Sequence, residues 1–521
     1  MQITYLGHAG FCVETSRSIV VMDPWVSPTG AFDSAWYQFP CNHHLAALIQ
    51  EKLQDATKDR YLYISHEHKD HFDLSFLNGL LARDFTLIVP HYRRPAIREL
   101  LADYRCRSLI TFDDGQEIPI ADGSVTLYID DSELNRDSAI LLRADGHSFL
   151  NLNDCKIHER LPEIRQMAGN IDIFACQFSG AIWHPTCYEY PEETYRRISR
   201  KKAMHKFEVT AKAIEAVEPR MFLPSAGPAV FLDPLLSHLN FEEVNIFPRA
   251  PQFLAYLEKR LRDSHRPEAP NIMPGDVVDV TTASLVYLVP DRVTEDNYHS
   301  YMRAYIARYE GFFRARRYDD SPGRIDLVLK RLQAELERKL DAFNLRERID
   351  RILYVGLLDG SGKLLRVDFH RGCVDPVDAI DDEDNYYSMS APYWEFERVL
   401  DQRLSWQDFS LTFRMRLSRA PDVYQTLVHG FLTMESEDLN HFCARLLDLE
   451  AATERIIVEA GGCRYSVNRF CPHQGGDLAQ AWVEEDRYLV CTRHGWRFDL
   501  PKGGQADTSS DTIQAIELED S

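Results

Sequence analysis

The first half of the chain alternates short apolar runs with segments of helical periodicity. Five of the runs have the length and β-branched content of buried strands. They cover residues 18–23, 60–65, 85–90, 148–153 and 171–175. A helical stretch follows at residues 252–263, and a linker-like composition comes directly after it. Strands that alternate with helices predict a layered α/β domain over residues 1–265.

The pattern changes twice after this domain. Two helical segments, residues 294–308 and 322–348, precede a pair of strand-like runs, and the last part returns to short strands with paired glycines. We therefore expect an α+β multidomain protein. Its second domain, residues 266–450, is predicted to be mixed α/β and to serve packing, dimerisation or covering of a substrate. The third domain, residues 451–521, is predicted to be small and all-β.

Composition and charge narrow the possible partners. The chain has 521 residues, 45% hydrophobic and 27% charged, so it can bury a substantial core. Its 59 basic and 81 acidic residues give a net charge of −22, the wrong sign for binding nucleic-acid phosphates. It opens directly on a strand-like segment, and no apolar run of ~18 residues follows. Eleven irregularly spaced cysteines suit a reducing compartment. We expect a cytoplasmic protein without nucleic-acid or membrane partners; a homo-oligomer is left open.

Two short Cys/His motifs lie near the end of the chain. Cys471-Pro-His473 and Cys491-Thr-Arg-His494 are separated by 17 intervening residues, and a glycine follows closely behind each histidine. Two cysteines and two histidines are also a zinc-ribbon donor set. The Cys-x-His and Cys-x-x-His spacing and the flanking residues resemble the Rieske family, in its ferredoxin and oxygenase branch.

The Rieske resemblance implies a [2Fe-2S] cluster. Cys471 and Cys491 would hold one iron, and His473 and His494 the other, so that the cluster carries one electron at a time. The second cysteine that respiratory Rieske proteins add to each loop is not present in either motif. Electrons would come from an external reductase, ferredoxin or cytochrome.

A second metal motif follows a predicted strand near residue 64. In the H-x-H-x-D-H run, His66 and His68 can bind one metal while Asp70 and His71 face a second. The motif resembles that of the metallo-β-lactamase superfamily, which implies an αββα sandwich for the first domain. In that superfamily the residue at the position of Asp23 orders the metal loop by hydrogen bonds. His8 either lines the pocket or is structural.

The metallo-β-lactamase resemblance implies three further metal ligands. Asp154, at the end of an apolar strand, is at the place of the bridging aspartate. Where the superfamily usually has a histidine, this chain offers Glu133, with Asp137 or Asp131 as alternatives. His184 is the choice for the last histidine. Carboxylate-richer sites suit iron, so we expect a dinuclear iron centre, with zinc as the alternative.

The pairing of the two motifs predicts redox chemistry, because a hydrolase has no use for an electron carrier. Ordered segments in the chain, among them residues 23–26, 64–71, 146–155 and 219–227, resemble the CMP-N-acetylneuraminate hydroxylase family. That family uses O2 to hydroxylate the N-acetyl methyl of a nucleotide sugar. The chain departs from the animal pattern in its C-terminal Rieske domain and in Glu133. The resemblance therefore implies a Rieske-coupled diiron monooxygenase of a small polar substrate: a nucleotide sugar, an N-acyl compound or an amine.

Two other functions remain open from the sequence. One is a dizinc hydrolase in which the Rieske domain senses the redox state. The other is an electron-transfer protein that reduces O2 or NO without an organic substrate. The basic cluster at residues 196–202 is either a solvated helix face or a site for a substrate phosphate, a substrate carboxylate or a redox partner.

Overall fold

The computed structural model describes residues 1–132, 135–180, 182–261, 266–316, 322–358, 362–381 and 383–518. Glu133 and the expected domain boundary at residue 265 lie outside these residues. The chain divides into two compact units. The first comprises Met1–Asp131, Asn135–Ala181 and Ser199–Glu310, and the second comprises Ser132–Leu134, Ile182–Ile198 and Gly311–Ser521. No helix among the described residues has the length and apolar character needed to cross a membrane.

The first unit contains two β-sheets. One has eight strands in the order β14-β13-β1-β2-β3-β4-β5-β6, and the other has six in the order β12-β11-β10-β9-β8-β7. The strands of the first are β1 (Gln2–Gly7), β2 (Gly10–Glu14), β3 (Ser18–Met22), β4 (Asp59–Tyr63), β5 (Thr86–Pro90), β6 (Ser108–Phe112), β13 (Val277–Asp279) and β14 (Ser284–Tyr287). Those of the second are β7 (Glu117–Ile120), β8 (Gly123–Ser132), β9 (Asn135–Ala144), β10 (His147–Asn151), β11 (Ile173–Gln177) and β12 (Met221–Ser225).

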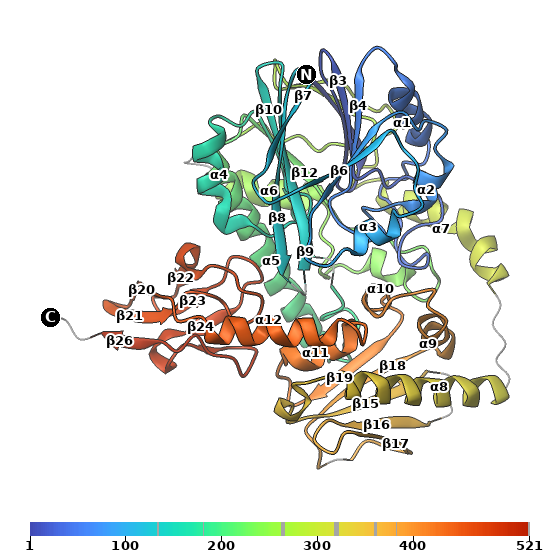
Figure 1. Ribbon diagram of the computed structural model, residues 1–521, viewed down its shortest axis with the longest axis vertical. Helices are drawn as coiled ribbons and strands as arrows, with labels where there is room; N and C mark the ends of the chain where they lie inside the picture. Colours follow the sequence, from blue (N-terminus) through green and yellow to red (C-terminus); the bar gives the residue numbers. More distant parts are fainter. Residues whose placement is uncertain are drawn as a thin grey trace. The chain divides into compact units, whose positions relative to one another are not determined.

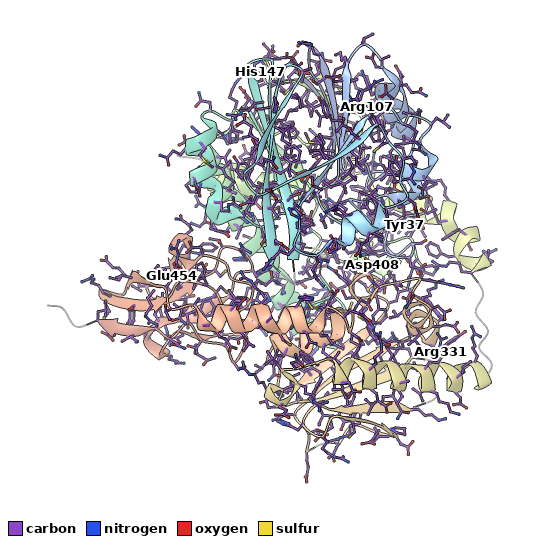
Figure 2. All side chains as sticks on the ribbon, viewed as in Figure 1. Tyr37, Arg107, His147, Arg331, Asp408 and Glu454 are labelled. Carbon is purple, nitrogen blue, oxygen red and sulfur yellow. The ribbon has the colours of Figure 1, made fainter. Side chains whose placement is uncertain are left out.

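Helices cover the outer face of each sheet (Figure 1). α1 (Leu45–Gln54), α2 (Leu74–Gly79) and α3 (Ala96–Leu100) share an apolar core with the eight-stranded sheet. α4 (Leu161–Ala168), α5 (Glu192–Val217) and α6 (Ala250–Arg260) share one with the six-stranded sheet. A third core joins the inner faces of the two sheets, where side chains fill the space (Figure 2). These four layers confirm the expected αββα sandwich.

Strand β3 shows why the strands are almost wholly apolar. Val20 and Met22 point into the core between the sheets, whereas Ile19 and Val21 point toward the helices. All four side chains are fully buried. A strand that is covered on both faces needs apolar residues at every position, so its sequence shows a continuous run instead of an alternation.

The second unit holds a five-stranded sheet in the order β17-β16-β15-β18-β19 and two small sheets, β20-β21-β26 and β22-β23-β24-β25. The strands are β15 (Ile352–Leu357), β16 (Leu364–Asp368), β17 (Cys373–Val377), β18 (Tyr386–Ala391), β19 (Arg416–Ala420), β20 (Arg455–Ala460), β21 (Cys463–Asn468), β22 (Trp482–Glu484), β23 (Tyr488–Val490), β24 (Arg497–Asp499), β25 (Gln505–Ala506) and β26 (Ile516–Leu518). The helices of this unit are α8 (Pro322–Asp341), α9 (Tyr393–Leu400), α10 (Trp406–Leu411), α11 (Thr426–Thr433) and α12 (Leu439–Ala451), whereas α7 (Tyr298–Ala315) lies mostly in the first unit. This mixed α/β part and the all-β end confirm the expected fold classes.

Candidate functional site

The H-x-H-x-D-H motif forms a turn between β4 and α2. The backbone N–H groups of His71 and Phe72 both donate to the carbonyl of His68, at 3.0 and 2.7 Å. Asp73 then caps α2 by accepting a hydrogen bond from the backbone of Phe76 at 2.9 Å. The motif therefore precedes the helix, and the tight turn gathers its side chains at one edge of the sandwich.

One group of donor atoms forms around His71 and Asp154. The Nε2 of His71 lies 2.9 Å from Oδ1 of Asp154, and the Nε2 of His66 lies 2.9 Å from Nδ1 of His68. Ligand atoms of His66, His71 and Asp154 all lie within 4.8 Å of one another. Asn153 adopts a φ of 54°, which asparagine tolerates better than most residues, in the turn that presents Asp154.

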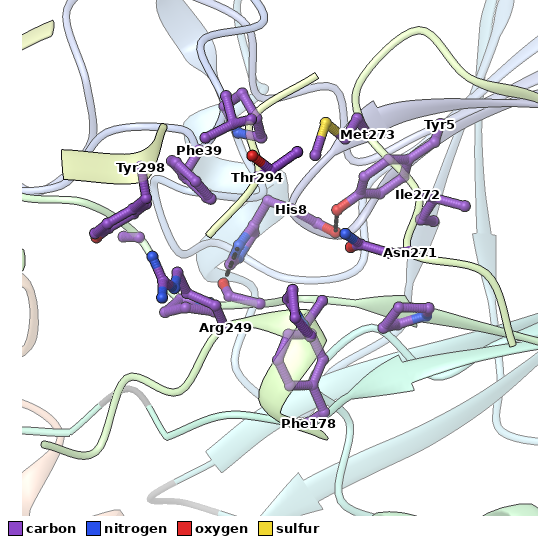
Figure 3. Close-up of a pocket in the computed structure, with 18 of the residues that line it drawn as sticks. Tyr5, His8, Phe39, Phe178, Arg249, Asn271, Ile272, Met273, Thr294 and Tyr298 are labelled. Carbon is purple, nitrogen blue, oxygen red and sulfur yellow. Dashed lines mark hydrogen bonds between the residues drawn. The ribbon is translucent and has the colours of Figure 1, made fainter. Parts of the chain in front are cut away.

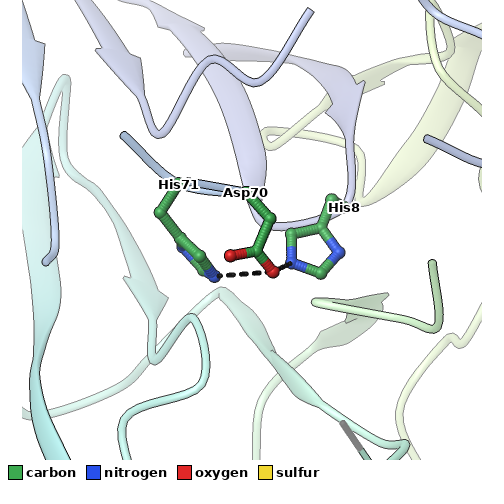
Figure 4. Close-up of side chains that lie close together, drawn as sticks. All are labelled: His8, Asp70 and His71. Carbon is green, nitrogen blue, oxygen red and sulfur yellow. Dashed lines mark ion pairs between the residues drawn. The ribbon is translucent and has the colours of Figure 1, made fainter. Parts of the chain in front are cut away.

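A second group contains His8, Asp70 and His71, again within 4.8 Å (Figure 4). The Nε2 of His8 is 3.1 Å from Oδ2 of Asp70. On the other side of the ring, Nδ1 of His8 lies 3.0 Å from the carbonyl oxygen of Gly227, in the loop after β12. A proton on Nδ1 that is donated to this carbonyl leaves the Nε2 lone pair directed at Asp70, the arrangement of a metal-bound histidine.

Asp23 holds the residues of the metal motif in place through hydrogen bonds. Its carboxylate accepts hydrogen bonds from the backbone N–H of Ser65 at 2.8 Å and from the Ser65 hydroxyl at 2.6 Å. The Nδ1 of His71 lies 2.8 Å from the same carboxylate. Asp23 thereby holds the proton of His71 on Nδ1, so that Nε2 is available as a ligand. This contact is the supporting hydrogen bond that the superfamily resemblance implies.

Several buried atoms of the cluster fit a metal centre. Oδ1 of Asp70 is buried without a hydrogen bond among the described residues, and Nε2 of His8 and Nε2 of His71 meet Oδ2 of Asp70 and Oδ1 of Asp154 only as ion pairs, at 3.1 and 2.9 Å. Buried polar atoms are costly when they have neither a hydrogen bond nor a metal. Their convergence within a few ångströms is what a bound dinuclear metal centre would satisfy.

Charges in the cluster are strongly coupled. Burial opposes a charge on His71, but Asp154 and Asp70 outweigh it and hold the pKa of His71 well above its usual range. Burial likewise opposes the Asp154 carboxylate, yet His71 holds its pKa well below normal. Burial, together with the neighbouring His66, lowers the pKa of His68 to about 4. His68 is therefore a neutral imidazole with a lone pair to offer.

The three carboxylates considered as the further metal ligand beside His66 and His68 differ in position. Oδ1 of Asp137 is 3.2 Å from Nδ1 of His66, and Asp137 is buried. Asp131 instead pairs with Arg93 at 3.1 Å. Glu133 lies outside the described residues. The structure thus brings one carboxylate from this segment, Asp137, to the metal motif.

His184 lies in a different part of the chain from the other expected ligands. It belongs to the second unit, where its Nε2 lies 3.1 Å from the hydroxyl of Tyr190 and its ring packs against Tyr188. His8 stands instead beside the loop after β12, the place of the family's last histidine. The Ala226 backbone N–H donates to the carbonyl of His8 at 2.8 Å. Sequence reasoning left His8 undecided because 218 residues separate it from Ala226.

The two Cys/His motifs of the second unit share one loop geometry. In each, the cysteine N–H donates to the carbonyl five residues on, at 2.9 Å, and the amide four residues on donates back to the cysteine carbonyl. That fourth residue is Gly475 in one loop and Gly495 in the other, both with a φ of 70°. Glycine reaches this conformation without the strain that a Cβ atom would bring.

The four Cys and His side chains face one another across the two loops. Cys471 and Cys491 are buried, and their thiols form a hydrogen bond that lowers the pKa of Cys491 against the opposing effect of burial. The rings of His473 and His494 have centroids 4.7 Å apart, and Trp496 stacks flat on His473 at 4.4 Å. Paired thiols beside paired imidazoles fit the donor set of a Rieske cluster.

A cavity of about 60 Å³ lies beside His8, with Phe39 and Tyr298 in its wall (Figure 3). Its wall is largely aromatic and apolar. Arg249 is the cationic residue in its lining and packs 3.7 Å from the centroid of the Tyr298 ring. The Nη1 atom of Arg249 is buried and makes no hydrogen bond among the described residues.

The fold and the donor sets together define the class: a protein in which a metallo-β-lactamase-like domain precedes a Rieske domain. The family model of the Rieske [2Fe-2S] domain matches residues 433–515. A Rieske 2Fe-2S iron-sulfur protein of Mycolicibacterium smegmatis is 26% identical over 539 residues, covering 99% of this chain and 100% of that protein.

Two further comparisons involve hydroxylases. The cytidine monophosphate-N-acetylneuraminic acid hydroxylase of Cricetulus griseus is 26% identical over 259 residues, 47% of this chain and 43% of that protein. Among solved structures, the diiron β-hydroxylase CmlA from Streptomyces venezuelae aligns with a TM-score of 0.35 and 16% identity over 53% of each chain.

Proposed function

We propose that the protein is a Rieske-coupled diiron monooxygenase that hydroxylates a small polar substrate: a nucleotide sugar, an N-acyl compound or an amine. The observation that carries this proposal is the presence of two different donor sets in one chain: an electron-carrying Cys/His set and a buried, carboxylate-rich His/Asp set. An O2-activating iron centre must be reduced before each turnover, and the Cys/His set would supply those electrons. The partial similarity to a hydroxylase from Cricetulus griseus supports the same reaction class.

The proposed iron ligands follow the geometry of the cluster. His66 and His68 would hold one iron, Asp70, His71 and His8 the other, and Asp154 would bridge the two; Asp137 contacts Nδ1 of His66 at 3.2 Å, on the side of the ring away from His68, and would orient that ring as Asp23 orients His71. Glu133 remains the proposed further carboxylate ligand beside His66 and His68. We propose His8 in the place first expected for His184, because its Nε2 faces Asp70. Such a mixed carboxylate and imidazole set suits iron, which would supply the redox chemistry that activates O2.

The chain's own residues prepare this centre. Asp23 keeps the Nδ1 proton on His71, and the Gly227 carbonyl does the same for His8. The buried positions of Asp70 and His71 exclude bulk water. A water-poor site with fixed ligands limits side reactions of a reactive centre.

The cavity beside His8 supports the choice of substrate class. Arg249 pairs through Nη2 with Glu295, which also lines the cavity, and its buried Nη1 keeps a donor for a phosphate, carboxylate or carbonyl oxygen of a substrate. The aromatic wall formed by Phe39 and Tyr298 can pack against a planar or ring-shaped part of the same molecule. Arg249→Met is expected to raise the KM for such a substrate while leaving both metal sites loaded.

The test is a screen of sugar nucleotides, N-acyl compounds and amines with reduced ferredoxin as the electron donor under 18O2. We expect one substrate to gain a single 18O atom, with O2 uptake that depends on the substrate. His68→Ala should abolish product, whereas His91→Ala, a matched control at an exposed histidine paired with Asp113, should not. Hydrolysis without O2 would instead establish a dizinc hydrolase, and O2 uptake that no substrate alters would establish an O2-reducing protein.

A further inference from the structure

Cys41 and His43 form a thiol–imidazole pair in the turn that leads into α1 of the first unit. The sulfur of Cys41 lies 3.5 Å from Nδ1 of His43, within hydrogen-bond distance for a thiol. Cys41 is partly buried, so its thiol keeps some access to solvent. Neither residue belongs to the two candidate metal sites, and the proposed function makes no use of either.

Gln38 decides which nitrogen of His43 carries the proton. Its amide Nε2 donates to the carbonyls of Trp25 and Ser27, both at 3.2 Å, and its side chain is 1% exposed. The amide oxygen therefore faces Nε2 of His43, at 3.3 Å, and can only accept a hydrogen bond. The proton of His43 thus lies on Nε2, and Nδ1 presents its lone pair to the thiol of Cys41.

His43 stays neutral at physiological pH. Burial, together with the positive charges of Arg308 on α7 and of His44, lowers the pKa of His43 to about 4. Its Nδ1 is therefore available to take up a proton when the thiol reacts. A thiol, an imidazole and an amide that orients the imidazole are the parts of a cysteine-dependent catalytic triad.

Helix α7 supplies a hydroxyl group beside the same sulfur. Tyr305 is 0% exposed, and its hydroxyl has no hydrogen-bond partner among the described residues. Burial, and after it the charge that a Cys41 thiolate would carry, raise the pKa of Tyr305 well above its ordinary value, so the hydroxyl keeps its proton. The Tyr301 hydroxyl accepts a hydrogen bond from the backbone N–H of Cys41 at 2.8 Å, which fixes Cys41 against this helix. A buried O–H donor next to the sulfur favours the thiolate over the thiol.

We propose that Cys41 is a reactive thiol that forms a mixed disulfide with a small-molecule disulfide. Nδ1 of His43 takes up the thiol proton, and the Cys41 sulfur attacks one sulfur of the small disulfide. The new S–S bond forms as the old one breaks, and the departing half takes up the proton and leaves as a thiol. Cys41 is oxidised, the departing half is reduced, and no further oxidant is needed.

The modified residue would stand next to the cavity wall. Phe39 and Pro40, the two residues before Cys41, line the cavity beside His8. The Phe39 ring also meets the ring of Tyr301 on α7 edge to face at 5.9 Å. The mixed disulfide would therefore form one peptide bond away from this wall. The reaction requires neither metal centre, so its failure would leave the proposed function untouched.

The experiment treats the metal-loaded full chain with hydroxyethyl disulfide and follows each cysteine by peptide mass spectrometry after an acid quench. Cys106 is the internal comparison, because it is also partly buried but its thiol donates to the carbonyl of Ser108 at 3.3 Å. Burial raises the pKa of Cys106. We expect Cys41 to react roughly 100-fold faster than Cys106 at pH 7, the lower end of what a positioned proton acceptor contributes. Equal rates at the two cysteines would overturn the proposal.

Two variants separate the role of the neighbours from simple exposure of Cys41. His43→Asn keeps a hydrogen-bond acceptor but cannot take up a proton, so it should slow the reaction of Cys41 to about the rate of Cys106. Tyr305→Phe keeps the ring and loses the hydroxyl, and it should slow the reaction roughly tenfold, as the loss of one hydrogen bond to a charged group would.

Tyr309→Phe is the matched control on the same helix. Its hydroxyl donates to the carbonyl of Pro28 at 2.9 Å, so this variant should react at the wild-type rate. In every variant the rate at Cys106 and the far-ultraviolet circular dichroism spectrum should be unchanged, which shows that the fold is retained. A wild-type rate at Cys41 in His43→Asn would show that the imidazole does not take up the thiol proton, and it would overturn the proposal.

Discussion

Asp23→Asn tests how the cluster is held in place. Asp23 is 1% exposed, and its carboxylate accepts hydrogen bonds from the Ser65 backbone, the Ser65 hydroxyl and His71 at 2.6–2.8 Å. Asparagine has the same size, but one of its two polar atoms is an NH2 group that cannot accept a hydrogen bond. The variant must therefore leave at least one of these three donors without an acceptor.

The magnitude follows from the contact that is lost. A hydrogen bond to a charged group contributes about 1.5–3 kcal/mol. Loss of a supporting partner at a metal site typically lowers metal affinity roughly 10–100-fold. A change of that size corresponds to about 1.4–2.8 kcal/mol, so the two estimates agree on one charge-assisted hydrogen bond. We expect the iron affinity of the first unit to fall by this amount, while the Rieske cluster stays loaded.

The assay is a chelator titration of iron from the purified protein, with the Rieske signal as an internal standard. Asp122→Asn is the matched control: this carboxylate also accepts short hydrogen bonds, from Thr15 and Ser18 at 2.6 Å and from the Arg17 backbone at 2.7 Å. Unchanged iron affinity in Asp23→Asn would refute the supporting role. Equal losses in the two variants would show that the effect is not specific to Asp23.

Three further predictions concern the two units separately. Cys471→Ala should abolish the cluster spectrum and leave iron in the first unit, and His68→Ala should do the reverse; loss of both centres in either variant would contradict independent sites. Glu395→Ala should lower the free energy of unfolding by about 3–5 kcal/mol, because it leaves the charge of Arg414, its fully buried partner at 2.7 Å, without a counter-charge. Chemical denaturation measures this loss, and a clearly smaller value would show that the buried charge of Arg414 is not left uncompensated. Burial lowers the pKa of Lys339 to about 7, against the opposing effect of nearby glutamates. Since the unfolded side chain titrates near 10.4, the unfolded state binds more protons between these values, and stability should rise with pH from about 7 to about 10.4. Lys339→Met should remove this rise in thermal melts, and a wild type whose stability does not change over that range would show that the ammonium stays charged.

The sequence was most informative where the relevant residues are contiguous. Strand β3 is apolar at successive positions because both of its faces are covered, and that pattern is visible without a structure. The H-x-H-x-D-H motif and the two Cys/His loops likewise carry their donors within a few residues. The fold classes could therefore be predicted, and so could the short loops that carry these candidate donor residues.

Donors that come together through tertiary structure could not be predicted in the same way. His8 reaches Asp70 because the β1–β2 turn lies beside the loop after β12, a contact between residues far apart in sequence. His184 had a suitable sequence context, yet it lies in the second unit. In both cases the position is decided by how strands and segments pack, which local sequence does not encode.

The central claim is that one chain holds a Rieske cluster and a separate dinuclear iron centre. Metal and acid-labile sulfide analysis of anaerobically purified protein, with electron paramagnetic resonance after dithionite reduction, tests it most directly. The account predicts about four irons and about two sulfides per chain with a Rieske-type signal. About two irons and about two zincs would contradict it, because the zinc-loaded centre would then have no use for the cluster's electrons.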